Sequence, residues 1–183
     1  MQTEIRNISE DESSEYLDSI YALNQKNTPE VGSLTNKDHL KKLLSQSNIL
    51  LCAFNQSSLI GFMVCMFEGS KYQSENYLFF SNQLSQFIYI DRIAVDLPYR
   101  QKGLGTHFYN ELARIRGERS VICCEVNSKP LNEPSIRFHK KNQFEECGTK
   151  DFEDGHSVIY FKKILSSQKL VCFCNYFWCK NDR

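Results

Sequence analysis

The strongest chemical signal in this 183-residue sequence is a glycine-bearing stretch between a predicted strand and a predicted helix, formed by Arg100, Gln101, Lys102, Gly103, Leu104, Gly105 and Thr106. A helix N-terminus presents unpaired backbone amides and the positive end of the helix dipole. Gly103 and Gly105 remove side chains that would keep a diphosphate away from those amides. Arg100 and Lys102 add positive charge, although backbone donors would carry most of the geometry. The stretch therefore predicts an anion-binding loop.

Two other phosphate-binding loops do not fit this stretch. The dinucleotide fingerprint requires a third glycine where this chain has Phe108. A Walker loop requires Gly-Lys-Ser/Thr at a spacing that is not met. The two glycines alone also fit a plain tight turn before a helix, so the surrounding residues decide the interpretation.

A second block makes the pattern more specific. It has the order Asn-x-x-small-x-x-apolar-Tyr/His-x-x-x-Gly-Phe and is matched by Asn132, Ser135, Phe138, His139 and Phe144, with Gln143 in place of the glycine. The first block matches R/Q-x-x-G-x-G/A through Arg100, Gly103 and Gly105, after Ile93-Ala94-Val95, Pro98 and Tyr99. Over about residues 3 to 163 the chain thus resembles the GCN5-related N-acetyltransferase (GNAT) superfamily. The second block is especially similar to that of phosphinothricin-type acetyltransferases. The run from Tyr72 through the Asp91-Arg92 pair to Glu125-Val126-Asn127 resembles a bacterial subgroup of uncharacterised, predicted acetyltransferases.

The resemblance implies an α/β (α+β) fold with a mixed, mostly antiparallel twisted sheet of about six or seven strands. The sheet is expected to splay between its fourth and fifth strands and to be flanked by about four helices. The implied co-substrate is acetyl-CoA or another short acyl-CoA, with its pantetheine arm in the gap and no metal. The residues expected to bind it are Ile93, Ala94, Val95, Arg100, Gln101, Lys102, Gly103, Leu104, Gly105, Thr106, Asn132 and His139.

Acyl transfer to an amine needs an unprotonated amine, a donor for the oxyanion and a proton source for the thiolate. His139 occupies the position where many members of the superfamily have a tyrosine assigned as general acid; it also fits a partly buried helix residue. Glu125 is the favoured base, because a carboxylate near the end of a buried strand is costly without a partner and burial raises its pKa. Asp91, expected on the same strand face as Ile93, is its rival. The structural alternative for Asp91 is a salt bridge with a surface lysine, and that for Glu125 is a hydrogen-bonded structural carboxylate; a water chain could replace both as base.

The acceptor is expected to contact aromatic residues. The proposed acceptor-binding residues are Tyr72, Tyr77, Phe80, Tyr89 and Glu125, with Phe79 as a further candidate. Ring faces suit an acceptor with an apolar or cationic part, although plain packing explains most aromatic residues equally well. A primary amine of a small molecule or peptide is the expected acceptor.

The elements that position these residues follow from hydrophobic periodicity and turn signals. Strands are predicted over 3–8, 49–54, 59–67, 87–95, 121–126, 144–148 and 157–163. Helices are predicted after Ser9, after Asn36, over 103–116 and over 134–141. Residues 69–86 show no regular period and predict a long aromatic-rich loop, a kind of segment that is often functional.

Composition limits the class of protein. Lysine plus arginine and aspartate plus glutamate both total 22, so no net charge favours nucleic acid or an anionic membrane as a partner. No signal peptide and no apolar run of about 20 residues is found, which predicts a cytoplasmic protein. Cys52, Cys65, Cys123 and Cys124 lie in apolar runs and are expected to be buried thiols.

The expected organisation is one acyltransferase domain over 1–165 and an apolar, cysteine-rich tail over 166–183. Cys172, Cys174 and Cys179 supply too few ligands for a metal site. The apolar tail suggests packing on the domain or a homodimer. The predicted activity is direct acetyl transfer in a ternary complex. An acyl-CoA-binding module without turnover and a structural interaction protein remain the alternatives.

Overall fold

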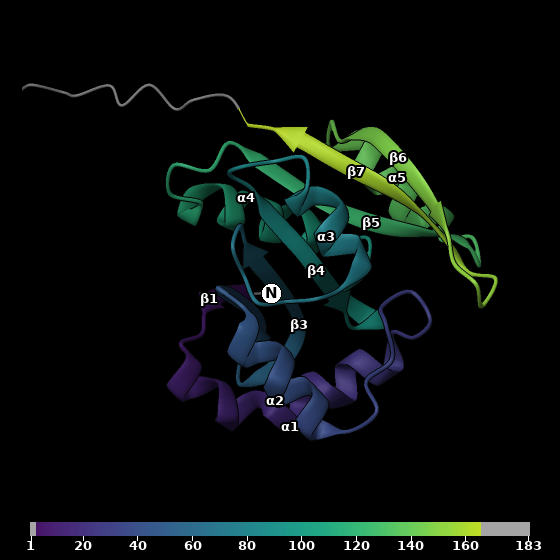
Figure 1. Ribbon diagram of the computed structural model, residues 1–183. Coiled ribbons are helices and arrows are strands. Elements are labelled where there is room, and N and C mark those ends of the chain that lie inside the picture. The colour runs from purple at the N-terminus through teal and green to yellow at the C-terminus, as the bar shows by residue number, and fades with distance from the viewer. Residues whose placement is uncertain (1–2, 166–183) are drawn as a thin grey trace, which may run out of the picture.

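A computed structural model describes residues 3–165, which form one seven-stranded sheet (Figure 1). The spatial order is β1-β2-β3-β4-β5-β7-β6. The strands are β1 (Thr3–Asn7), β2 (Ile49–Asn55), β3 (Ser58–Phe67), β4 (Ile88–Val95), β5 (Val121–Lys129), β6 (Glu145–Asp151) and β7 (Ser157–Ile164). Every neighbouring pair is antiparallel except β4 with β5, which confirms the predicted mixed sheet. The predicted tail and its three cysteines lie outside the described residues.

Helices cover both faces of the sheet. They are α1 (Glu10–Lys26), α2 (Lys37–Gln46), α3 (Glu75–Ser81), α4 (Leu104–Ile115) and α5 (Glu133–Lys141), with a 3₁₀ turn, η1, at Leu97–Tyr99. Ser9 and Glu12 form the predicted capping box of α1, and the Asn36 side chain caps α2. One buried cluster joins the sheet to α1, α2 and α3, and a second joins it to α4 and α5. Cys52 and Cys123 lie in the first cluster, and Cys65 and Cys124 in the second, as free buried thiols.

The sheet parts between β4 and β5. The two strands pair at three positions only: Ile88 with Ile122, Tyr89 with Cys123, and Ile90 with Cys124. Beyond these pairs β5 continues against β7, while β4 continues against β3. The predicted splay between the fourth and fifth strands is therefore confirmed, and it leaves one edge of each strand open.

The aromatic-rich segment of residues 69–86 is not wholly a loop, because it contains α3. Tyr77 and Phe80, three residues apart, form the buried face of this helix. A helix of seven residues shows barely two turns of periodicity, so its apolar spacing does not stand out among the surrounding aromatic residues.

A β-bulge on β4 corrects a second expectation. Cys65 of β3 lies opposite Ile90 and Val64 lies opposite Arg92, so Asp91 is the extra residue. An extra residue breaks the alternation of side chains along a strand. Ile93 packs in the α4 and α5 cluster, whereas Asp91 and Arg92 both face the side of α1 and α3. The prediction that Asp91 shares the face of Ile93 is therefore wrong.

Candidate active site

The anion-binding loop follows η1 and enters α4 through two left-handed residues. Gln101 has φ 59° and Gly103, the N-cap of α4, has φ 84°. The first backbone hydrogen bond of α4 runs from the His107 N–H to the Gly103 carbonyl, at 3.0 Å. The amides that precede His107 in the first turn are thus not used by the helix. Because Gln101, Lys102, Gly103 and Thr106 are exposed, these amides are placed where an anion can approach.

The two glycines serve different purposes. A Cβ on Gly103 would touch nothing within 4 Å, so its positive φ is the reason for glycine at that position. A Cβ on Gly105 would lie 3.2 Å from the ring of Phe138. Gly105 therefore allows α4 to approach α5, in addition to leaving the loop unobstructed.

Arg100 is engaged within the protein. Its Nε donates to the Val95 carbonyl at 3.0 Å, and its Nη2 donates to Asn27 Oδ1 at 2.6 Å. The guanidinium thus ties the loop to the end of β4 and to the C-terminus of α1. Lys102 is exposed, with its Nζ 5.8 Å from the Tyr99 ring centroid, beside a pocket of about 230 Å³ that Thr3, Ile60, Tyr99, Lys102, Leu104 and His107 line. Of the two cations, Lys102 has the freer approach to a ligand.

The main chain of β4 presents alternate residues to the gap. The Asp96 N–H donates to Ile60 O in β3 at 2.9 Å, and the Ala94 carbonyl lies over Gly61 of β3. Because the main-chain N–H and C=O groups of successive residues in a strand point to opposite sides, those of Ile93 and Val95 point toward the gap. Ala94 has its side chain buried in the core and its carbonyl on the β3 side, so Ile93 and Val95 are better placed than Ala94 to contact the co-substrate. Asn132, on the other side of the gap, caps α5: its Oδ1 accepts from the Ser135 N–H at 3.2 Å, which leaves its amide nitrogen for a ligand.

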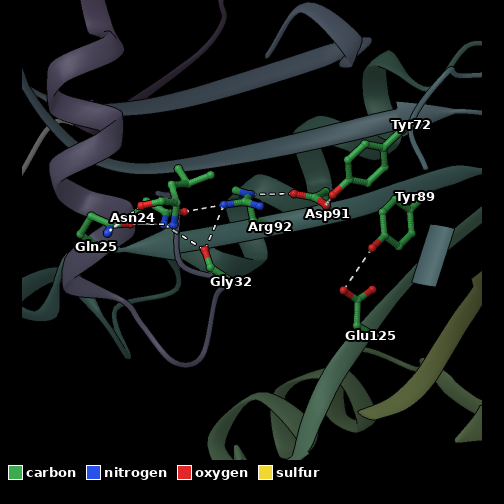
Figure 2. A network of polar contacts seen from close by, with 9 residues as sticks. Asn24, Gln25, Gly32, Tyr72, Tyr89, Asp91, Arg92 and Glu125 are labelled. Atoms are coloured by element: carbon green, nitrogen blue, oxygen red, sulfur yellow. Dashed lines mark hydrogen bonds and ion pairs between the residues drawn. The ribbon is translucent and has the colours of Figure 1, made fainter. Parts of the chain in front are cut away.

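Glu125 is the first residue of β5 beyond the last pair with β4. Its Oε1 accepts from the Tyr89 hydroxyl at 3.1 Å, and its Oε2 is buried without a hydrogen-bond partner (Figure 2). The Asn76 amide of α3 approaches the same carboxylate without completing a bond of normal geometry to Oε2. Burial, followed by the charge of Asp91, raises the pKa of Glu125 to about 8. A base with this pKa is suited to accepting a proton near neutral pH.

Asp91 has both carboxylate oxygens occupied. Oδ1 accepts from the Tyr72 hydroxyl at 2.5 Å, and Oδ2 accepts from Arg92 Nε at 2.6 Å. Arg92 also donates through Nη1 to Asn24 Oδ1 at 2.8 Å and to the Gly32 carbonyl at 3.2 Å. The ion pair is almost fully buried, unlike the surface pair expected from sequence as the alternative to catalysis. This arrangement favours Glu125 over Asp91 as the base.

His139 is also enclosed, with 3% of its surface exposed. Its Nδ1 lies 2.8 Å from the Ser135 carbonyl, which can only accept, so Nδ1 carries the proton. Nε2 lies 2.7 Å from the Tyr109 hydroxyl and therefore accepts. Burial lowers the pKa of His139 to about 4. A neutral ring with both nitrogens engaged is poorly placed to donate a proton, which argues against the predicted role of His139 as general acid.

Most of the expected acceptor-binding aromatic residues are core residues. Tyr77, Phe80 and Tyr89 are at most 2% exposed and pack on one another. The Tyr77 hydroxyl donates to the Phe67 carbonyl at 2.8 Å. Tyr72 and Phe79 are partly exposed, and Phe79 stacks on Tyr160; Tyr89 contributes its hydroxyl to Glu125. Sequence reasoning missed Asn24, Arg92, Asn76 and Tyr160, whose hydroxyl donates to Asn76 at 3.0 Å. The one available signal was a charged pair, Asp91 and Arg92, inside an apolar strand.

Two kinds of feature are absent from the described residues. Within 3–165, no group of three or more His, Cys, Asp or Glu side chains is arranged to hold a metal ion. Over the same residues, no helix has the length and apolar character required to cross a bilayer.

Solved structures share this fold. Ard1 from Thermoplasma volcanium superposes with a TM-score of 0.70 at 19% identity, covering 91% of this chain and 100% of its own. Arabidopsis thaliana NAA60 in complex with a bisubstrate analogue gives 0.69 at 16% identity, with 90% and 98% covered. Ribosomal-protein-alanine N-acetyltransferase from Brucella melitensis gives 0.64 at 21% identity, with 88% and 99% covered. Because these sequence identities are all below 25%, the similarities show a shared fold only. No curated protein matches the sequence.

The profile of the Acetyltransferase (GNAT) family matches residues 13–144, which is more than half of the chain. The match includes the anion-binding loop, the splayed strands and the block from Asn132 to Phe144. Together with the parted sheet, it shows that this chain belongs to the GNAT family of acetyltransferases.

Proposed function

We propose that the protein transfers an acetyl group from acetyl-CoA to the primary amine of a small molecule or peptide, by direct attack in a ternary complex, with Glu125 as the base. The observation that carries the proposal is the position of Glu125. It follows directly the last residue of β5 that pairs with β4, and one of its oxygens is buried without a partner. A buried oxygen in this state is ready to accept a hydrogen bond from an incoming amine.

The residues present fit acetyl-CoA. The first-turn amides of α4 and the exposed Lys102 would hold its diphosphate. The main-chain groups of Ile93 and the N–H of Val95 would bond to the pantetheine arm along the open edge of β4, while the Val95 carbonyl is already bonded to Arg100. The Asn132 amide nitrogen would reach the arm from the β5 side. When bound, acetyl-CoA supplies the activated acyl carbon.

The chain's own chemistry is acid-base chemistry at Glu125. The nitrogen of the amine forms the new C–N bond, the C–S bond breaks, and its electron pair stays on sulfur. Ionised Glu125 takes the proton that the amine loses, and the Tyr89 hydroxyl holds the carboxylate in place. The departing thiolate takes a proton from solvent, in keeping with the engaged, neutral ring of His139.

The acceptor is proposed as an amine class. Burial of Glu125 beside the aromatic rings of Tyr72 and Tyr89 suits an amine on an apolar or cationic carrier. Two structural relatives are named as ribosomal-protein-alanine N-acetyltransferases, from Brucella melitensis and Escherichia coli. A peptide with an N-terminal alanine therefore belongs in the first panel of acceptors, beside amino acids, diamines and a lysine peptide.

The test is acetyl-CoA turnover with that panel, with acetylated products detected by mass spectrometry. We expect one amine class to be acetylated, and Glu125→Gln to slow that reaction while coenzyme binding measured by calorimetry stays intact. Binding of coenzyme without acetylation of any amine would support the alternative, an acyl-CoA-binding module. Failure to bind coenzyme would contradict both.

A further inference from the structure

Two carboxylates lie where β4 and β5 part, and their surroundings differ. Asp91 is the bulge residue of β4, next to the last paired residue Ile90. Glu125 is the corresponding residue of β5, next to Cys124. Asp91 has a guanidinium partner, Arg92, in direct contact. Glu125 has no ion-pair partner among residues 3–165, and the polar side chains beside it, the Tyr89 hydroxyl and the Asn76 amide, are neutral.

Arg92 connects Asp91 to the end of α1. Asn24 is fully buried, accepts from Arg92 through its Oδ1, and donates to the Gly32 carbonyl at 3.1 Å. Arg92 binds that same carbonyl. The chain of contacts therefore runs from the α1–α2 connection through Arg92 and Asp91 to Tyr72, as Figure 2 shows. Buried networks of this kind fix geometry when every member is satisfied.

We propose, on the basis of the proposed function, that Arg92 is a positioning residue: it holds Asp91 and Tyr72 on the bulge and partly compensates the Asp91 charge, whereas Glu125, the carboxylate opposite it where β4 and β5 part, has no cationic partner among residues 3–165. The bulge is essential to this role, because without it Asp91 and Arg92 would point to opposite faces. Arg92 acts through Asp91 and Tyr72.

Few other groups near Glu125 carry charge. Among residues 3–165, the ionisable groups that lie near it are Tyr89 and Asp91 on β4, Tyr72 before α3, Tyr160 on β7, and Cys123 and Cys124 on β5. Asn76 on α3 is uncharged. Burial raises the pKa of each of these tyrosines and thiols, so they stay neutral near pH 7. In the described part of the chain, the Asp91–Arg92 pair is thus the charged neighbour of Glu125.

The test follows the side-chain ¹³C carboxyl signal of Glu125 in the free, full-length protein as pH is changed. The signal is identified by its loss in Glu125→Gln. Asp91→Asn removes a negative charge that disfavours ionisation of Glu125, so we expect the titration midpoint to fall by about one pH unit. Arg92→Lys keeps a positive charge but cannot reproduce the guanidinium contacts, so we expect a smaller upward shift and about a tenfold loss in kcat/KM for the acceptor, with coenzyme affinity unchanged.

The matched control is the ion pair between Glu68 and Arg119, which also packs beside β4 but is partly exposed and lies at its other end. Glu68→Gln is expected to leave the Glu125 midpoint and acceptor kinetics unchanged. An unmoved Glu125 midpoint in folded Asp91→Asn would overturn the proposal. So would an equal shift in Glu68→Gln. The titration does not depend on turnover, so it tests the role of Arg92 separately. Full activity of Glu125→Gln would instead contradict the proposed function, in which Glu125 is the base. Failure of this proposal and failure of the proposed function can therefore be distinguished.

Discussion

The two ends of the open edge of β4, beyond its pairs with β5, differ in the groups that they offer to a ligand. At the loop of residues 100–106, the available groups are main-chain amides, and the side chains are mostly exposed or, as for Arg100, engaged elsewhere. At the bulge, the groups are enclosed side chains: Asp91, Arg92 and Glu125. Main-chain donors depend on backbone conformation and tolerate changes in side chains. Enclosed charges depend on their neighbours, because burial and a nearby charge set their pKa.

The largest expected effect is a loss of catalysis at Glu125 while coenzyme binding at the loop is kept. Glu125→Gln keeps the size of the side chain and removes its basicity, so we expect kcat to fall by about 10² to 10⁴-fold. Coenzyme affinity measured by calorimetry should stay within about twofold, since the loop amides are untouched. Glu145→Gln, an exposed carboxylate on β6, is the control and should keep wild-type kcat. A comparable loss of coenzyme affinity in Glu125→Gln would show that the two regions are not separate.

A second substitution is expected to weaken coenzyme binding at the loop without affecting Glu125. Gly105→Val adds a side chain whose Cβ lies 3.2 Å from the Phe138 ring, which forces α4 and α5 apart. Overpacking of this kind costs about 1 to 3 kcal/mol; because it displaces the start of α4, which holds the loop amides, we expect coenzyme affinity to fall by about 5- to 150-fold. Gly105→Ala should give a smaller loss in the same calorimetric assay. The Glu125 titration midpoint should be unchanged in both variants; a shifted midpoint would contradict the separation.

The pH dependence sharpens the comparison. The pKa of Glu125 is raised to about 8, and a base acts when ionised, so kcat/KM should rise about tenfold per pH unit below 8 and level off above it. The measurement needs an acceptor whose amine titrates well below pH 7, so that the amine does not contribute to the profile. Coenzyme affinity should vary little over the same range. A profile that is flat from pH 6 to 9 would exclude Glu125 as the base.

The smallest effect concerns Lys102. Its ammonium is exposed, and exposed charges contribute little in water and are screened by salt. Lys102→Ala is therefore expected to weaken coenzyme binding by about two- to fivefold at low salt, with the difference disappearing at about 1 M salt. A loss of a hundredfold would mean that side-chain charge, rather than main-chain amides, dominates the loop.

Much of the fold and of the loop could be predicted from local sequence. Gly103 precedes a helix with a clear apolar face, and this pattern depends on neighbours within a few residues. The capping residues Ser9 and Asn36 were predicted for the same reason. The helix α3 was missed because seven residues give too little periodicity to distinguish a helix.

The arrangement of the two carboxylates, Asp91 and Glu125, could be predicted only partly from the sequence. Glu125 stood out as a charge in an apolar strand, and its burial agrees with that interpretation. The face of Asp91 was predicted wrongly because a β-bulge depends on the register between β3 and β4, which no local pattern reports. The proposed acid His139 is bonded to Tyr109, 30 residues away along the chain, and such a partner cannot be inferred from spacing.

By itself, the sequence determined which backbone segments form the sheet, where a helix begins at Gly103, and which family this chain belongs to, because these properties arise from short-range periodicity, capping and motif order. Only the tertiary structure decided which charged groups are paired. Asp91 meets Arg92 through the bulge, Arg92 meets Asn24 across 68 residues of chain, and Glu125 keeps an oxygen without a partner. Pairing and burial are properties of the assembled core, and they decide the charge that each group carries.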